Sequence, residues 1–312
     1  MEAALQTIGT GGAVIVKELS LVESFIRSQD VKESSRHLYE RTLKLFLKWA
    51  KDTGLSMAEI TRAEVLRYKD GLLADGKSPL TVGGYLTVVR KFYEWAEGLK
   101  LYPNIAKGIK TPRRKQQFQK QPLTEDKGRE LLEYFRGAAL RDFALVNLLI
   151  RCGLRTIEAS RALVGDIDIR GGRRVLWVHG KGRDSKDAFV VLTDKAYEPI
   201  RAYLESRGAV KADEPLFLSG CNRNIAGRLS TRAISRICKD GLKAIGLDEK
   251  TFTAHSLRHT TAVNILRAGG NLGDAQGVLR HANPATTQIY TATMNEELRL
   301  RNPAEALIDA VL

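Results

Sequence analysis

The chain has 312 residues, with 50 Lys and Arg against 36 Asp and Glu, a formal net charge of +14 and a pI of about 9.7. This length accommodates two domains with separate cores, and the basic balance favours a polyanionic partner, nucleic acid before a membrane surface. No segment approaches the roughly 20 apolar residues of a membrane span. The three cysteines, Cys152, Cys221 and Cys238, lack the spacing of a disulfide framework or a zinc site. The cysteine spacing therefore predicts free thiols in a reducing cytosol. The basic composition is also compatible with a well-solvated surface that binds no polyanion.

The first domain is expected to be a small bundle of helices. Residues 1–16 contain GTGG and lack the basic start of a signal peptide, so they are interpreted as a flexible tail. Between residues 17 and 106 apolar residues recur at helical spacing, which predicts four or five helices. In the first long helix, Leu38, Leu45 and Trp49 are expected to share one face.

Three helix boundaries are predicted from capping signals in this domain. Ser34 or Ser35 is a plausible N-cap for the first long helix, and Gly54 a plausible stop. A second long helix is expected to start near Ser78, with Pro79 in its first turn.

The segment 107–122 is typical of a linker, because it is rich in Pro, Gln and basic residues and holds no acid. One interpretation is a solvated spacer. The interpretation we favour is a cationic strap along a phosphate backbone, where each neutralised phosphate releases counterions. Its expected DNA-binding residues are Lys107, Lys110, Arg113, Arg114 and Lys115.

A larger second domain is predicted from residue 123 to 312. Its expected helices cover 124–136, 140–151, 194–206, 230–245, 256–268 and 303–311. Short β-like runs at 165–169, 173–180 and 186–192 are separated by Gly-rich turns. The predicted fold is mostly α-helical, with a small antiparallel β-sheet on one side of this domain.

Two histidines and one arginine lie close together in TAHSLRHTTAVNIL, near the start of a predicted helix. His255 shares a helix face with Arg258 at i+3 and with His259 at i+4. Positive charge at a helix N-terminus opposes the helix dipole, and a bound phosphate would remove that conflict. A zinc pair is the alternative, but the Glu of an HExxH motif is missing. Taken alone, either histidine is more simply interpreted as a core residue whose hydrogen bonds are made within the protein.

Two further candidates lie upstream. In GLRTIE, Arg155 precedes Glu158 by three residues, so the two form either a weak local ion pair or a fixed guanidinium for a phosphate. In HGKGRDSK, Lys181 lies in a Gly-flanked turn between two strands, from which its amine would reach across a groove. A solvated turn lysine is the simpler interpretation.

The motifs GLRTIE, GKG, HSLRH, LRH and TQIYT occur in this order, and Tyr290 follows His281 by nine residues. In this the chain resembles the tyrosine recombinase (phage integrase) family, from about residue 18 to its end. The resemblance implies a helical, SAM-like core-binding domain and an α+β catalytic domain that form a C-shaped clamp on DNA. The chain is similar to the two-domain Xer-like and simple integrases, which have no arm-binding domain.

The resemblance implies a site-specific recombinase that cleaves and rejoins DNA through a 3′-phosphotyrosyl intermediate and a Holliday junction, with Tyr290 as the nucleophile. Arg155 and Arg258 would clamp the phosphate, and Lys181 would protonate the leaving 5′ oxygen. His255 would take part in proton transfer, and His281 would hydrogen-bond the phosphate. Glu158 and His259 would support the site. Neither a metal ion nor another cofactor is required, since the covalent link conserves the bond energy.

Three positions depart from the family pattern. Arg280 replaces the glycine that usually precedes the histidine, which is expected to alter the turn or to add a phosphate contact. Lys186, in a longer hairpin than usual, competes with Lys181 for the role of general acid. Ala159 replaces the commoner Leu and changes packing only.

Two other classes of protein are alternatives to this one. A metal-dependent transposase or nuclease would need clustered carboxylates, and Asp166 and Asp168, expected on one face of a strand, have no obvious third acid beside them. A catalytically inactive or regulatory DNA-binding protein derived from a recombinase is the other, but every catalytic position is filled.

The resemblance also implies partners. These are double-stranded DNA recombination sites, a homotetramer on two such sites, and accessory DNA-bending or directionality proteins, at the nucleoid in the cytoplasm and away from membranes. Residues 303–312 are expected to form a helix that docks into a neighbouring protomer. The sequence leaves open the target site, the element that carries the gene, and the choice between integration, excision and resolution.

Overall fold

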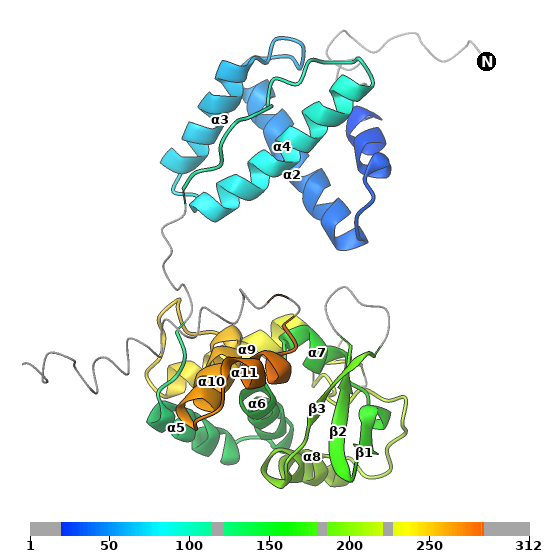
Figure 1. Ribbon diagram of the computed structural model, residues 1–312, viewed down its shortest axis with the longest axis vertical. Coiled ribbons are helices and arrows are strands. Elements are labelled where there is room, and N and C mark those ends of the chain that lie inside the picture. Colours follow the sequence, from blue (N-terminus) through cyan, green and yellow to red (C-terminus); the bar gives the residue numbers. More distant parts are fainter. Residues whose placement is uncertain (1–19, 114–120, 180–185, 221–226, 282, 284–312) are drawn as a thin grey trace, which may run out of the picture. The chain divides into compact units, whose positions relative to one another are not determined.

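The computed structural model describes residues 20–113, 121–179, 186–220, 227–281 and 283. The chain divides into two compact units, residues 1–117 and 118–312, and each has its own hydrophobic core (Figure 1). The division falls within the segment expected to be a linker. Among the described residues, none of the helices has the length and apolarity needed to cross a membrane.

The described part of the first unit contains helices over 20–28, α2 (Glu33–Asp52), α3 (Arg62–Ala74) and α4 (Pro79–Gly98). Aromatic rings form much of its core, with Phe25 and Phe92 in edge contact at 5.5 Å between ring centroids. Ile109 is buried in the same core, so packing of this unit extends beyond residue 106.

The residues predicted to share one face of α2 are only partly buried. Leu43 and Phe46 are fully buried, whereas Leu38 is 56% exposed and Leu45 is also exposed. Trp49 packs against the core from a partly buried position. The stripe that Leu38, Leu45 and Trp49 were predicted to share therefore lies at the edge of the core and not at its centre, because apolar spacing does not reveal which stripe of a helix its neighbours will cover.

Of the three helix boundaries predicted in this unit, two are confirmed and one was wrong. The N-cap of α2 is Lys32, so the prediction of Ser34 or Ser35 was wrong by two or three residues. Gly54 follows the end of α2 with a positive φ of 74°, as a helix stop requires. Ser78 caps α4 through its side chain, which accepts a hydrogen bond from the N–H of Thr81, and proline stands in the first turn, as predicted.

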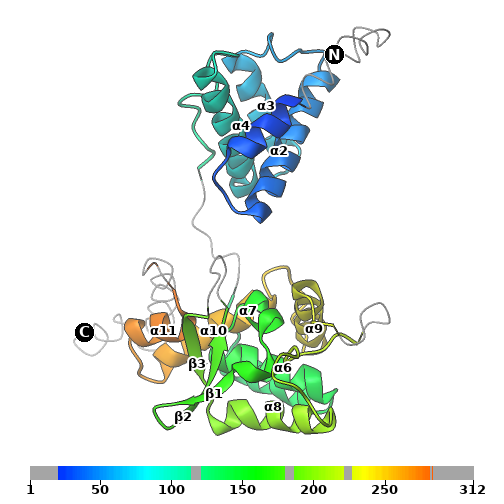
Figure 2. The ribbon, with the colours of Figure 1, turned by 90° about the vertical axis from the view of Figure 1, so that its right-hand side faces the viewer.

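The second unit is mostly helical. Its long helices match the predicted ranges to within about two residues. They are α5 (Glu125–Arg136), α6 (Leu140–Cys152), α8 (Asp194–Ser206), α9 (Thr231–Ala244) and α10 (Ala254–Arg267). Helix α6 is buried over most of its length and contacts α5, α8 and α10, so it is the centre of this core. Figure 2 shows α10 with α11 on one side and α9 on the other, and α10 contacts both.

A three-stranded antiparallel sheet in the order β1-β2-β3 lies at one side of these helices (Figure 1). The strands are β1 (Ile167–Arg170), β2 (Arg173–Val178) and β3 (Ala188–Val191). Leu176 pairs with Ile167 on one side and Val190 on the other, and this face packs on the core. The segment that joins β2 to β3 in the sequence contains Lys181, which lies outside the described residues.

Two short helices and one 3₁₀ turn were not predicted. They are α7 (Thr156–Arg161), α11 (Leu272–Leu279) and η1 (Val164–Asp166). Segments of three to eight residues are too short to show a helical hydrophobic period, and isolated helices of this length are unstable without tertiary contacts. Both α7 and α11 position the candidate site.

Candidate active site

The site begins at the turn between α6 and α7. Gly153 ends α6 with a left-handed backbone (φ 58°), and Arg155 is the N-cap of α7. The carboxylate of Glu158, three residues later, accepts hydrogen bonds from the backbone N–H of Arg155 at 2.8 Å and from its Nη1 at 2.8 Å. The Arg155 side chain remains 31% exposed and Glu158 only 1%. One glutamate therefore caps the helix and orients the arginine.

Gly153 also allows a close approach of two helices. A Cβ atom built on it would lie 2.6 Å from Cδ2 of Leu279 in α11 and 3.3 Å from Cγ2 of Thr261 in α10. The Thr261 hydroxyl donates to the carbonyl of Ile150 at 2.8 Å, which ties α10 to the end of α6. Glycine is required here both for the positive φ and for the space.

Arg258 is buried beneath this turn, with its side chain 1% exposed. Its Nη1 donates to the carbonyl of Gly153 and its Nη2 to the carbonyl of Leu279. Nη1 also lies 4.0 Å from Oε2 of Glu158. The guanidinium thus joins α10 to the α6–α7 turn and to the end of α11, and it adds buried positive charge at the point where these segments meet.

Arg280 ends α11 in a left-handed conformation, with φ 55° and ψ 46°. For a residue with a Cβ this conformation costs roughly 1–2 kcal/mol, which glycine avoids. Its Nη2 donates to Oε2 of Glu158 at 2.7 Å, and its side chain is 10% exposed. Arginine adopts this conformation here, and its guanidinium is directed inward to Glu158.

Glu158 is therefore shared by three arginines. Burial alone would raise the pKa of this carboxyl, but the charge of Arg280, together with the N–H and guanidinium of Arg155, holds the pKa below its usual range. Three guanidinium groups, including Arg258, and one carboxylate leave a net charge of +2. Fixed positive charge in a poorly solvated region attracts an anion far more strongly than it would in water.

The histidines of the site differ in environment. Burial, and then the nearby charges of Arg258, Arg155 and Arg280, lower the pKa of His281 to about 4, so its imidazole is neutral at pH 7. The rings of His255 and His259 contact each other edge to face, 4.7 Å between centroids, as the i,i+4 spacing predicts. His255 is exposed, whereas His259 is buried.

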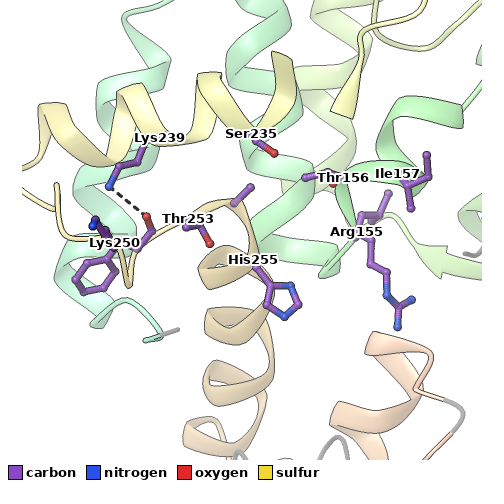
Figure 3. A pocket seen from close by; sticks show the side chains of 11 residues that line it. Arg155, Thr156, Ile157, Ser235, Lys239, Lys250, Thr253 and His255 are labelled. Carbon is purple, nitrogen blue, oxygen red and sulfur yellow. Dashed lines mark hydrogen bonds between the residues drawn. The ribbon is translucent and has the colours of Figure 1, made fainter. Parts of the chain in front are cut away.

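A cavity of about 680 Å³ opens beside Arg155 and His255 (Figure 3). Thr253, the residue before α10, lines this cavity together with Lys239 and Lys250. The Nζ of Lys239 donates to the carbonyls of Asp248, Glu249 and Phe252, which shapes the loop that leads into α10. The side chains around the cavity combine cationic and hydroxyl groups with apolar ones such as Ile157 and Phe252, a composition suited to a sugar–phosphate backbone.

The structure brings together seven of the predicted site residues. All belong to the second unit, and they are Arg155, Glu158, His255, Arg258, His259, Arg280 and His281. Lys107, Lys110 and Arg113 lie in the first unit. Lys181, Arg114, Lys115 and Tyr290 lie outside the described residues, as do residues 303–312.

Lys186, the rival general acid, pairs with the buried carboxylate of Asp166. Asp166 also accepts from the N–H of Leu163 at 2.9 Å and so closes the 3₁₀ turn η1. Asp168 lies exposed on β1. The expectation that both aspartates share a face of one strand was wrong, because Asp166 precedes the strand. In the part of the chain that the structure describes, no three His, Cys, Asp or Glu side chains gather as a metal site would require.

Sequence reasoning missed three contributors to this site. They are the carbonyl oxygens of Gly153 and Leu279, which Arg258 holds, and the loop-shaping Lys239. Backbone carbonyls carry no side-chain signature, so no sequence pattern reveals them. The glycine before Leu154 was the available signal for a tight turn at this position.

The phage integrase family model matches residues 121–297, and the model of the phage integrase N-terminal SAM-like domain matches residues 22–98. The chain belongs to the phage integrase family. Among curated members, it is 31% identical over 258 residues to the tyrosine recombinase XerC of Salmonella typhi, covering 81% of this chain and 83% of that one. It is 29% identical over 296 residues to the tyrosine recombinase XerA of Thermococcus kodakarensis, covering 94% and 97%.

Solved structures of this family share the fold. The XerH site-specific recombinase bound to a palindromic difH substrate matches with a TM-score of 0.73 at 20% identity, over 92% of this chain and 84% of that chain. A lambda integrase dimer bound to a core site matches with a TM-score of 0.66 at 18% identity, over 86% and 96%. The predicted fold class, a mostly helical protein with a SAM-like domain and a catalytic domain with a small antiparallel sheet, is confirmed.

Proposed function

We propose that this member of the phage integrase family is a site-specific DNA recombinase that cleaves and rejoins DNA through a 3′-phosphotyrosyl intermediate. The observation that carries the proposal is the arrangement of Arg155, Arg258 and Arg280 around one buried carboxylate, beside an open cavity. Its net positive charge suits a phosphodiester that gains negative charge in the transition state.

In the proposed reaction the hydroxyl oxygen of Tyr290 attacks a phosphodiester. A bond forms between this oxygen and phosphorus, the bond from phosphorus to the 5′ oxygen breaks, and the leaving strand ends in a 5′ hydroxyl. The phenol proton passes to a nearby base, for which exposed His255 is proposed, and a second proton reaches the leaving oxygen. Attack by the 5′ hydroxyl of another strand reverses these steps and rejoins DNA through a Holliday junction, without a metal ion or another cofactor.

The described residues suit different parts of this reaction. Arg155 is partly exposed at the cavity, so its guanidinium would contact a non-bridging oxygen directly. Arg258 is buried and holds two carbonyls, so it would act mainly through its charge and by fixing the turn. Neutral His281 would donate an N–H to the phosphate without adding a further charge.

For the general acid we propose Lys181, because Lys186 is already paired with Asp166. General acid catalysis contributes about 10²- to 10⁴-fold, so Lys181→Met is expected to lower the cleavage rate by that amount. A substrate with sulfur in place of the bridging 5′ oxygen leaves as a thiolate and needs no proton. It should restore the rate of Lys181→Met, and failure to do so would assign Lys181 another role.

The proposal is tested by covalent trapping. Footprinting on the DNA that flanks the gene identifies a binding site, and nicked duplexes of that site trap the protein–DNA adduct, which is scored on denaturing gels. Tyr290→Phe should bind the duplex with unchanged Kd and form no adduct. An adduct with this variant would exclude Tyr290 as the nucleophile, and a wild-type protein that binds without forming adducts would indicate a DNA-binding protein. Wild-type adduct formation in EDTA is also expected.

We also propose that the protein assembles as a homotetramer on two double-stranded DNA sites, at the nucleoid in the cytoplasm, with accessory DNA-bending or directionality proteins. The linker cations from Lys107 to Lys115 would contact the DNA backbone. The core-binding domain and the catalytic domain would together form the C-shaped clamp on DNA. Deletion of residues 303–312 should weaken pairing of two sites in a gel-shift assay more than binding of one site. Equal losses would argue against exchange of this segment between protomers.

A further inference from the structure

Arg280 occupies a backbone position that ordinarily favours glycine. Among the described residues, the non-glycine residues with positive φ are Lys100 and Arg280. Lys100 is an exposed residue in the first unit, whereas the side chain of Arg280 is 10% exposed and directed into the protein. A residue that carries both an unfavourable φ and a buried charge needs interactions that offset both.

The contacts of Arg280 join three segments of the chain. Its Nη2 donates to Oε2 of Glu158 in α7 at 2.7 Å and lies 3.4 Å from the carbonyl of Gly153 in the α6–α7 turn. Its Nη1 donates to the carbonyl of Val278 within its own turn. The next residue is His281, whose backbone N–H donates to the backbone carbonyl of Gln276 at 3.2 Å. The guanidinium therefore links the backbone that carries His281 to the carboxylate that orients Arg155.

We propose that Arg280 is a positioning residue for strand cleavage, which locks the turn bearing His281 onto Glu158 and so holds His281 and Arg155 in register around one phosphate. This inference rests on the function proposed above and concerns the same site.

Two features of the site support this role. Arg280 and Arg155 use different oxygens of Glu158 for their guanidinium contacts, Oε2 and Oε1, so neither displaces the other. With Arg280 the cluster carries a net charge of +2, and without it +1. The extra charge compensates Glu158, which would otherwise weaken the attraction between Arg155 and a phosphate.

The test compares three variants of the full chain. Arg280→Gly removes the guanidinium and relieves the backbone, Arg280→Lys keeps the charge without the planar fork, and Lys100→Gly relieves the same kind of backbone conformation without touching the site. Each is measured for the single-turnover rate of adduct formation on the nicked duplex, for the Kd of that duplex, and for the pKa of His281 by NMR without DNA.

Arg280→Gly should lower the adduct rate about 10- to 100-fold, as expected for a displaced catalytic group, while the Kd changes less than about threefold. The pKa of His281 should rise, because a neighbouring positive charge is lost. Arg280→Lys should recover part of the rate, and Lys100→Gly should match the wild type in all three measurements.

A wild-type rate in Arg280→Gly would overturn the inference, and so would an unmoved His281 titration. A rate loss matched by an equal loss of DNA affinity would also overturn it, by making Arg280 a DNA contact. If the wild-type protein forms no adduct on DNA, the proposed function fails by itself, and the His281 titration then decides whether Arg280 is coupled to the turn.

Discussion

Removing the charge of Glu158 tests whether this carboxylate holds the arginine cluster together. Glu158→Gln keeps the shape of the side chain but places an amide donor where one oxygen accepts. That oxygen is either Oε1, which takes Arg155 Nη1 at 2.8 Å, or Oε2, which takes the Arg155 N–H at 2.8 Å and Arg280 Nη2 at 2.7 Å. Arg258, 1% exposed, loses the negative charge that lies 4.0 Å from its Nη1.

Breaking a buried ion pair by removing one partner costs about 3–5 kcal/mol, because the remaining charge is buried without compensation. We therefore expect Glu158→Gln to lower the free energy of unfolding of the second unit by about 3–5 kcal/mol. Urea unfolding followed by circular dichroism measures this loss, and the transition of the first unit, which has a separate core, serves as an internal reference.

Glu133→Gln is the matched control. Glu133 also pairs with an arginine three residues away at 2.8 Å, but it is 68% exposed on α5. An exposed pair contributes less than about 1 kcal/mol, so this substitution should barely move the transition. If Glu158→Gln and Glu133→Gln cost the same, the inferred buried electrostatic cluster does not stabilise the fold and the reasoning is refuted.

Three further predictions concern the same region. Gly153→Ala should lower the free energy of unfolding of the second unit by several kcal/mol, measured by urea unfolding. Roughly 1–2 kcal/mol comes from the positive φ, and the rest from a methyl group 2.6 Å from a leucine of α11. A loss smaller than about 1 kcal/mol would contradict the close approach. Because the folded pKa of His281 is about 4 and its unfolded value about 6.5, the stability it contributes is complete above pH 6.5 and is lost, up to about 3 kcal/mol, as the pH falls toward 4. His281→Gln should flatten the unfolding free energy between pH 6.5 and 5, and an unchanged slope there would exclude His281 as its source. Lys186→Met should lower the melting temperature, since it leaves Asp166 buried with one partner fewer, yet keep the adduct rate within about threefold; a loss of 10²-fold or more would make Lys186 the general acid in place of Lys181.

Much of this protein was predictable because the signals are local. The period of apolar residues in α5, α6, α8, α9 and α10 is set by the geometry of the helix itself, so their bounds were predicted to within about two residues. The order and spacing of the GLRTIE, HSLRH and LRH motifs identified the family before the fold was known. The i,i+4 ring contact of His255 and His259 likewise follows from helix geometry alone.

The tertiary structure decided the burial and the partners of the charged residues, because both come from segments far apart in the chain. Arg258 was expected to clamp a phosphate, and the fold buries it against two carbonyls. Arg280 was expected to alter its turn or to contact DNA, and the fold pairs it with Glu158, 122 residues earlier. The short helices α7 and α11 exist only because their neighbours complete them. Local chemistry thus determined the family and the long elements, and packing between distant segments determined the electrostatics of the site.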